Sequence, residues 1–207
     1  MHHLRGKFVV LDGGEGCGKS TQAQRLRARI EAQGVEVLLV RDPGTTRVGE
    51  LIRAILLNPD HDEMAMRCEM LLYMAARAQM MSQIILPALT QGKLVICDRF
   101  VSSTLAYQLG GDGLSADEIR SVAQIALKGR WPDLTLIFDM PVERSIARVT
   151  RAKDRIEQRP IEYHQQVRSN YLAQAEADPS RHRIIAADRT PDEVEADVWR
   201  AVQLLTD

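Results

Sequence analysis

A glycine-rich stretch near the N-terminus, residues 8–21, limits what this chain can fold into more than any other feature. Four apolar residues, Phe8 to Leu11, precede the pattern G-x-x-x-x-G-K-S, which runs from Gly13 to Ser20. The apolar run predicts a buried parallel strand. The glycines after it allow backbone N–H groups to converge on a phosphate chain at the N-terminus of a helix. The stretch therefore predicts the opening strand, loop and helix of a P-loop protein.

Two side chains of this pattern carry specific chemistry. The ammonium group of Lys19 is expected to reach the β- and γ-phosphates of a nucleoside triphosphate. The hydroxyl of Ser20 is expected to bind Mg²⁺, with water and phosphate oxygens as the other ligands.

Length and composition fit one domain of an ordinary globular protein. The chain has 207 residues, of which 45% are hydrophobic and 27% charged, and its net charge of −1 argues against binding a nucleic-acid polymer or an anionic membrane. Its three cysteines, Cys17, Cys68 and Cys97, have no metal-site spacing, and this suits a reducing cytoplasmic setting. No apolar run approaches the roughly 18 residues that a transmembrane helix needs.

Strand-like and helix-like segments alternate along the rest of the chain. After the first strand, further strands are expected at 35–40, 93–97, 134–138 and 183–187. Helices are expected at 21–33, 48–57, 62–90, 102–109, 115–129, from 142, at 161–176 and at 191–205. This alternation predicts right-handed crossovers and an α/β, three-layer P-loop NTPase fold with a five-stranded parallel sheet flanked by helices. Residues 1–207 are expected to form a single domain, with a short basic flap, or LID, at about 148–160.

Ligands of such sheets bind at the carboxyl ends of the strands. The second expected strand ends in Arg41-Asp42 and the third in Asp98-Arg99. Asp98 fits the second Mg²⁺ ligand of a P-loop protein, although an aspartate there can also cap a helix. The fork of Arg99 matches a phosphate, although a surface ion pair is the alternative.

The motifs exclude some P-loop classes. The chain is not expected to be a GTPase, because it contains neither N-K-x-D nor D-x-x-G. It is also short for a helicase or a transporter ATPase. A small phosphotransferase with a charged flap remains. Cations that close over a transferring phosphoryl group are concentrated there: Arg144, Arg148, Arg151, Lys153, Arg155 and Arg159. A solvated helix face with i,i+4 ion pairs would explain the same charges.

Six segments together resemble the bacterial thymidylate kinases, a family of nucleoside monophosphate kinases. They fall in the family's order and cover nearly the whole chain: FVVLDGGEGCGKSTQ, RDPGTTRVGELIR, EMLLYMAARAQM, DRFVSSTLAYQ, PDLTLIFDMPVE and DRIE. The resemblance implies transfer of the γ-phosphoryl group of ATP to dTMP, with Mg²⁺, by a homodimer.

The resemblance also implies roles for individual residues. Mg²⁺ would be held by Ser20 and Asp98, and the dTMP phosphate by Arg99. Catalysis would depend on Lys19, Asp98 and Arg99, with a flap arginine taken from Arg148, Arg151 and Arg155. The ATP phosphates would be bound by Gly13, Gly14, Glu15, Gly16, Cys17, Gly18, Lys19, Ser20 and Thr21, with Arg148 beside them. The nucleoside and acceptor phosphate would be bound by Asp42, Tyr73, Arg77, Arg99, Thr104, Tyr107 and Gln108.

This sequence departs from the family's pattern at several of these positions. Asp12 and Asp42 each stand where the family usually has Glu, and Tyr73 stands where it usually has Phe. A side chain that is one methylene shorter reaches about an ångström less far, a gap that water can bridge. Tyr73 and Tyr107 also lie on apolar helical faces, where a tyrosine can be ordinary core.

Two other functions remain open at this stage. The nearer one is a kinase for another acceptor, either a different nucleoside monophosphate or a deoxynucleoside. Deoxynucleoside kinases share an Asp-Arg pair and a basic flap, and Asp42 could then be the general base. A non-catalytic, ATP-binding regulator is the more distant alternative. The acceptor that stimulates ADP release distinguishes all three.

Overall fold

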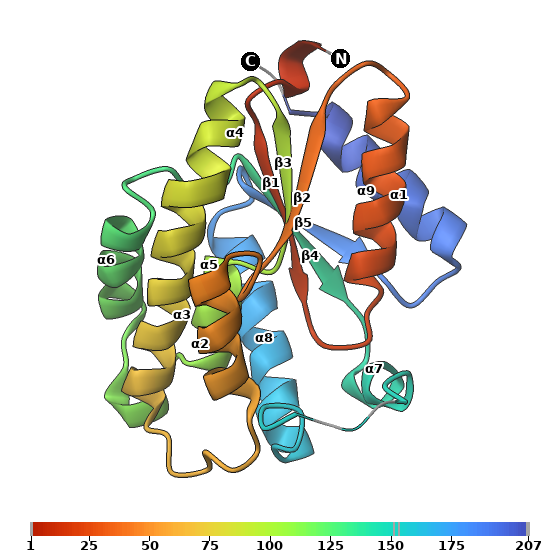
Figure 1. Cartoon of the computed structure of the whole chain (residues 1–207). Coiled ribbons are helices and arrows are strands. Elements are labelled where there is room, and N and C mark those ends of the chain that lie inside the picture. The colour runs from red at the N-terminus through yellow and green to blue at the C-terminus, as the bar shows by residue number, and fades with distance from the viewer. Residues whose placement is uncertain (1, 151, 153, 206–207) are drawn as a thin grey trace.

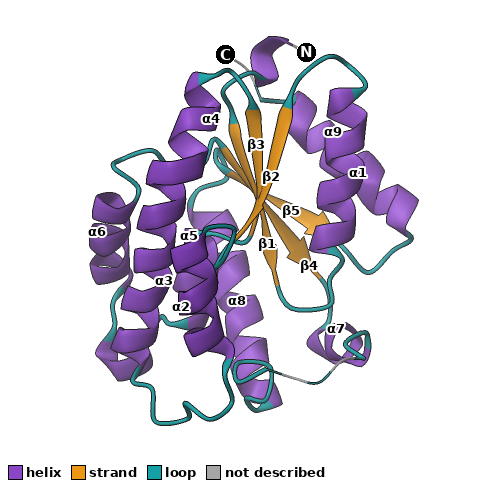
Figure 2. Cartoon of the chain, viewed as in Figure 1, coloured by secondary structure: helices purple, strands orange, loops and turns teal. Residues whose placement is uncertain are grey.

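A twisted sheet of parallel strands forms the centre of the molecule (Figures 1 and 2). The computed structural model describes residues 2–150, 152 and 154–205. The described part contains five strands in the spatial order β2-β3-β1-β4-β5, all parallel to their neighbours. In chain order they are β1 (Phe8–Gly13), β2 (Val37–Arg41), β3 (Leu94–Asp98), β4 (Leu134–Asp139) and β5 (His182–Ala186). The predicted α/β fold class is therefore confirmed.

Helices cover both faces of this sheet and give it the expected three layers (Figure 2). One face carries α1 and α9, while α3, α4, α5, α6 and α8 lie on the other side of the sheet. The helix bounds are α1 (Lys19–Glu31), α2 (Arg47–Leu57), α3 (Met66–Met80), α4 (Leu86–Thr90), α5 (Val101–Tyr107), α6 (Ala116–Ala126), α7 (Val142–Ala147), α8 (Ile161–Ala177) and α9 (Pro191–Gln203). Short 3₁₀ turns occur at His2–Leu4 and Gly111–Gly113.

The central strand β1 shows why its sequence is apolar at every position. Val9 and Leu11 belong to the core cluster shared with α1 and α9, whereas Phe8 and Val10 belong to the cluster on the opposite face. All four side chains are fully buried, because a strand in the middle of a parallel sheet has no solvated face. The run is therefore continuous and not alternating.

The register of the strands brings their polar ends together. Leu11 pairs with Asp98 on one side and with Leu136 on the other, and Arg41 of β2 pairs with Asp98. The phosphate loop, Asp42 and Asp98-Arg99 consequently emerge at one edge of the sheet, where bound ligands are expected.

The long helix expected at 62–90 is interrupted. Helix α3 runs to Met80, a π-helical turn spans Met81–Ile85, and α4 continues from Leu86. Pro87 has no N–H to donate to the preceding turn, and the wider turn lies directly before it. The sequence pattern contained the proline but did not predict the change of helix type.

The flap at 148–160 is described only in part. Arg151 and Lys153 lie outside the described residues, and 154–159 forms turns that lead into α8. Among the described residues, no helix combines the length and apolarity that a membrane crossing requires.

Candidate active site

A cleft of about 450 Å³ opens at the carboxyl ends of β1, β2 and β3. Its walls come from the phosphate loop, the ends of β2 and β3, helices α3 and α5, and the flap. The predicted residues that line it are Glu15, Gly16, Gly18, Lys19, Ser20, Thr21, Asp42, Tyr73, Arg77, Asp98, Arg99, Thr104, Tyr107, Gln108 and Arg148. Most of the predicted site residues, from six separate segments, therefore meet around one cavity.

The glycines of the loop are required by its close packing. Gly13 has a φ of 136°, and a Cβ there would lie 2.5 Å from the carbonyl oxygen of Phe138. Gly18 directly precedes α1 and has a left-handed φ of 89°. Both positions favour a residue without a side chain, so the loop can turn tightly into the helix N-terminus.

Lys19 is held inside the loop. Its Nζ donates to the carbonyl oxygens of Gly13 at 3.2 Å and Gly14 at 2.5 Å, and the side chain is buried. Burial and the nearby Arg99 act to lower the pKa of Lys19, but Cys17, Glu15 and Asp98 outweigh them and raise it. The ammonium group therefore stays charged at the place where a triphosphate would lie.

Ser20 and Asp98 bring two oxygens together at the edge of the sheet. The Oγ of Ser20 donates to Oδ2 of Asp98 at 2.5 Å. Among the described residues, no group of three or more His, Cys, Asp or Glu side chains is arranged to hold a metal ion. Two hard oxygen donors beside a phosphate site nevertheless fit Mg²⁺, which usually takes only one or two protein ligands together with phosphate oxygens and water.

A buried arginine organises the opposite wall of the cleft. Arg77 on α3 is fully buried and donates from Nε to Oδ2 of Asp42 at 2.6 Å. Its other donors reach Thr104 Oγ1 and the carbonyl oxygen of Phe100, each at 2.7 Å. One side chain thus ties the end of β2 to α5, and the wall is fixed by charge-assisted hydrogen bonds.

Asp42 retains an unused acceptor in this wall. It is 1% exposed, and its Oδ1 is buried with no hydrogen-bond donor among the described residues. Burial raises the pKa of Asp42, although the positive charge of Arg77 opposes the shift. A buried acceptor without a donor is costly, so Oδ1 suits a hydroxyl or N–H group supplied by a ligand.

Tyrosine rings complete the cleft. The guanidinium of Arg77 lies 5.6 Å from the ring centre of Tyr73, and that of Arg99 lies 5.5 Å from the ring centre of Tyr107. Tyr107 also packs edge-on against Tyr163 and Tyr171. Burial raises the pKa of both the Tyr73 and Tyr107 hydroxyls, so they remain protonated donors. These rings are at once part of the protein's packing and part of the cleft surface.

Three of the predicted phosphate-loop residues lie beside the cleft or behind it. Gly13 forms the end of β1, and the backbone of Gly14 accepts from Lys19. Cys17 is buried and donates from Sγ to the carbonyl oxygen of Gly14 at 3.0 Å. Its thiol thus contributes to the shape of the loop.

The flap arginines lie in different places. Arg148 lines the cleft, and its Nη2 lies 3.9 Å from Oδ1 of Asp188. Arg155 instead turns toward α2 and α3, where it is buried, forms an ion pair with Glu69 and donates to the carbonyl oxygen of Leu56 at 3.0 Å. Arg151 is outside the described residues, so its predicted catalytic role remains a prediction.

Sequence reasoning missed Glu69, which is fully buried on α3. It accepts from Arg155, from Arg159 at 3.2 Å and from Gln108 at 2.7 Å. A single acid within the apolar run EMLLYM was the available signal. Other cleft residues to which the sequence assigned no role include Arg53, Ser103, Asp154 and His164. Arg53 is the last residue of the family-like segment RDPGTTRVGELIR, although no role was predicted for it, and His164 gave no signal because only the fold brings its helix to the cleft.

A phosphate loop and a Ser–Asp oxygen pair in one part of the cleft, with a buried arginine in its opposite wall, define the class: a P-loop kinase that acts on a small molecule. The chain belongs to the thymidylate kinase family. A family model described as thymidylate kinase matches residues 11–198.

Individual relatives agree with this membership over nearly the whole chain. A thymidylate kinase of Pelotomaculum thermopropionicum is 45% identical over 207 residues, which cover 99% of this chain and 96% of that protein. One from Pseudomonas syringae pv. syringae is 45% identical over 195 residues, with 93% of each protein covered. The crystal structure of thymidylate kinase from Ehrlichia chaffeensis superposes with a TM-score of 0.78 at 28% identity and covers 97% of this chain and all of that one.

Proposed function

We propose that this protein transfers the γ-phosphoryl group of ATP to the 5′-phosphate of dTMP, giving dTDP and ADP. The observation that carries the proposal is a single cleft with two unlike ends. One end is a phosphate loop with a buried Lys19, and the other is a closed pocket built around Arg77 and Asp42. Arg99 lies between them, within reach of both substrates. Membership of the thymidylate kinase family supports the choice of acceptor.

The reaction needs positioning and charge neutralisation more than proton transfer. The attacking oxygen belongs to an ionised phosphate, so no general base is required. Lys19 would hold the β- and γ-phosphates, and Arg99 would hold the acceptor phosphate in line with the γ-phosphorus. Lys19 is buried and Arg99 is partly buried, and this strengthens their interaction with the charge that spreads over the transferring group.

Mg²⁺ would be held by Ser20 directly and by Asp98 directly or through water. The 2.5 Å approach of their oxygens beside the phosphate loop supports this pair. The ion would neutralise charge on the β- and γ-phosphates.

The acceptor pocket has the features that a deoxynucleotide requires. Arg77 and Thr104 would face the thymine, with Tyr73 stacking on the base and Tyr107 and Gln108 on the sugar side. The unused Oδ1 of Asp42 would accept a hydrogen bond from the sugar. A 2′-hydroxyl would crowd the ring of Tyr107.

The flap and the surface complete the proposal. The whole chain would act as one cytoplasmic domain, with residues 148–160 as a lid whose Arg148 and Arg151 approach the transferring phosphoryl group.

A homodimer is proposed because α2 and the adjoining α3 expose several large apolar side chains: Val48, Leu51, Ile55 and Leu71. Their exposure on neighbouring helices is more than isolated surface residues require.

The direct test is ADP release from ATP and Mg²⁺ with dTMP, dUMP, dCMP, UMP, AMP, GMP or thymidine as acceptor. A clear preference for dTMP is expected. Activity on thymidine alone would make Asp42 a general base and the protein a deoxynucleoside kinase. ATP binding without any acceptor-dependent ADP release would instead indicate a regulator.

A further inference from the structure

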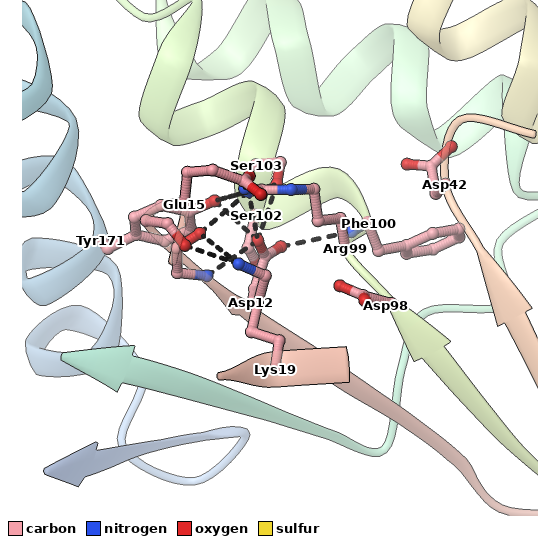
Figure 3. Close-up of polar contacts among 12 residues, drawn as sticks. Asp12, Glu15, Lys19, Asp42, Asp98, Arg99, Phe100, Ser102, Ser103 and Tyr171 are labelled. Atoms are coloured by element: carbon pink, nitrogen blue, oxygen red, sulfur yellow. Dashed lines mark hydrogen bonds and ion pairs between the residues drawn. The ribbon is translucent and has the colours of Figure 1, made fainter. Parts of the chain in front are cut away.

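A fully buried carboxylate, that of Asp12, lies directly behind Arg99. Asp12, the penultimate residue of β1, accepts four hydrogen bonds (Figure 3). Its Oδ1 accepts from Ser103 Oγ and Tyr171 Oη, each at 2.6 Å, and from the Gly13 N–H at 3.0 Å. Its Oδ2 accepts from the Phe100 N–H at 3.2 Å. Strand β1, helix α5 and helix α8 therefore meet on one carboxylate.

The direction of these hydrogen bonds follows from counting protons. Ser103 and Tyr171 each have one hydroxyl proton, and their oxygens also lie 2.9 Å from each other. The carboxylate is closer to both, at 2.6 Å, and is charged, so both hydroxyls donate to Asp12. Their oxygens are then left as acceptors, and Nη1 of Arg99 lies 3.3 Å from Ser103 Oγ and 3.4 Å from Tyr171 Oη. The same Nη1 lies 3.7 Å from Oδ1 of Asp12. The two hydroxyl oxygens therefore offer acceptors to Nη1, which also donates to the Gly13 carbonyl oxygen at 2.9 Å, while Nη2 pairs with Glu15 at 2.8 Å.

The backbone of Arg99 adopts a conformation that needs support from neighbouring groups. Arg99 has a φ of 68°, in the left-handed region that a residue with a Cβ seldom adopts. Such a conformation persists only where neighbours over-determine it. The N–H of Arg99 donates to Leu11 at 2.9 Å, and the next N–H, that of Phe100, donates to Asp12. Asp12 therefore restrains both the backbone and the side chain of Arg99.

We infer that Asp12, together with the hydroxyls of Ser103 and Tyr171, is a positioning unit that fixes the aim of Arg99 at the acceptor phosphate. This inference rests on the proposed function. Tyr171 belongs to α8, the helix that begins directly after the flap, so the unit also joins the flap's anchoring helix to the Arg99 loop. Burial raises the pKa of the Tyr171 hydroxyl well above its ordinary value, and Asp12 adds to this, which keeps the tyrosine a donor.

The test is a double-mutant cycle with Tyr171→Phe and Arg99→Lys. Tyr171→Phe keeps the buried ring and removes one hydroxyl. If it acts through Arg99, it lowers kcat/KM for dTMP about tenfold in the wild-type background and less than about twofold in the Arg99→Lys background. The KM for ATP stays within about twofold, because the phosphate loop is untouched. Equal losses in both backgrounds would show a structural role only and overturn the inference.

Further measurements keep the test decisive. Ser103→Ala removes the other hydroxyl without disturbing a ring, and it must show the same dependence on Arg99. Should Arg99→Lys turn over too slowly, the dissociation constant for dTMP replaces kcat/KM in the same cycle. Ser115→Ala, which removes a helix cap on α6 away from the cleft, controls for lost stability. A wild-type protein without dTMP-dependent ADP release would refute the proposed function, whereas an active wild type with equal losses refutes only this inference.

Discussion

The two ends of the cleft are built in opposite ways. The acceptor end is a buried scaffold, in which Arg77 is fully enclosed and every contact that holds it is within the protein core. At the donor end, Arg148 is half exposed and lies 3.9 Å from a partly exposed Asp188. One end is a preformed pocket, and the other is lined by side chains that solvent can reach.

This difference predicts how much of the protein must become ordered when each substrate binds. A preformed pocket costs little further ordering when its ligand arrives, so it can discriminate among bases by shape and hydrogen bonding. Exposed arginines would have to be ordered by the triphosphate, and in the proposed reaction they would close around it only when it is bound. Substitutions at the acceptor end should therefore mainly lower the free energy of unfolding, and substitutions at the donor end should mainly lower kcat.

The largest effect is expected at Lys19, a strongly buried cation of the donor end. Lys19→Ala should lower kcat by at least about a thousandfold, because a preorganised charge on the transferring phosphoryl group is lost. Steady-state ADP release with dTMP measures this, and thermal melting serves as the control for folding. Activity within about tenfold of the wild type would contradict the role of Lys19.

At the acceptor end, Arg77→Met should act first on stability. It leaves Asp42 as an unpaired, buried carboxylate and should lower the free energy of unfolding by about 3 kcal/mol. The matched control is Arg148→Met at the donor end, which should change it by less than about 0.5 kcal/mol. Urea unfolding of both variants makes the comparison. Equal losses in the two variants would remove the distinction between the two ends.

The variant Arg155→Lys tests whether Arg155 stabilises the acceptor end or takes part in catalysis. Arg155→Lys keeps the charge but loses the fork that reaches both Glu69 and the Leu56 carbonyl oxygen. If Arg155 is part of the acceptor scaffold, unfolding free energy falls by about 2 kcal/mol while kcat stays within about fivefold. Glu69→Gln should have a similar effect, because it breaks the same ion pair. A large loss of kcat with unchanged stability would instead support the catalytic role predicted from the sequence.

The sequence predicted the fold and most of the cleft because both depend on local patterns. An apolar run followed by glycines specifies a strand and a phosphate loop, and Asp98-Arg99 follows directly from its position after a strand. The sequence did not predict which way a flap arginine turns. Arg148 and Arg155 have the same local chemistry, and only the buried Glu69 on a distant helix separates them. The Asp12 cluster was missed for the same reason, since its donors lie 91 and 159 residues away along the chain.

The smallest effect is expected at an exposed ion pair between Glu118 of α6 and Arg67 of α3, the helix that also carries Arg77. Glu118 accepts from the Ser115 N–H and hydroxyl, each at 2.9 Å, and from Arg67 of α3 at 3.1 Å. These hydrogen bonds, those from Ser115 first, lower the pKa of Glu118 from 4.5 to about 2. A carboxyl whose pKa is lower in the folded state stabilises that state above its ordinary pKa, and the contribution is lost as the pH falls toward the folded value.

Glu118→Gln should therefore flatten the fall in stability between about pH 5 and pH 2 and leave kcat near neutral pH unchanged. Urea midpoints of wild type and variant at several pH values give the measurement, with the difference between the two proteins as the quantity of interest. If Glu118→Gln weakened the protein as much as Arg77→Met does, burial would not be what separates strong ion pairs from weak ones on α3. We expect a large loss of stability for Arg77→Met and a small, pH-dependent loss for Glu118→Gln. This contrast would show that the ion pairs of the acceptor end stabilise the protein because they are buried, and not because they are numerous.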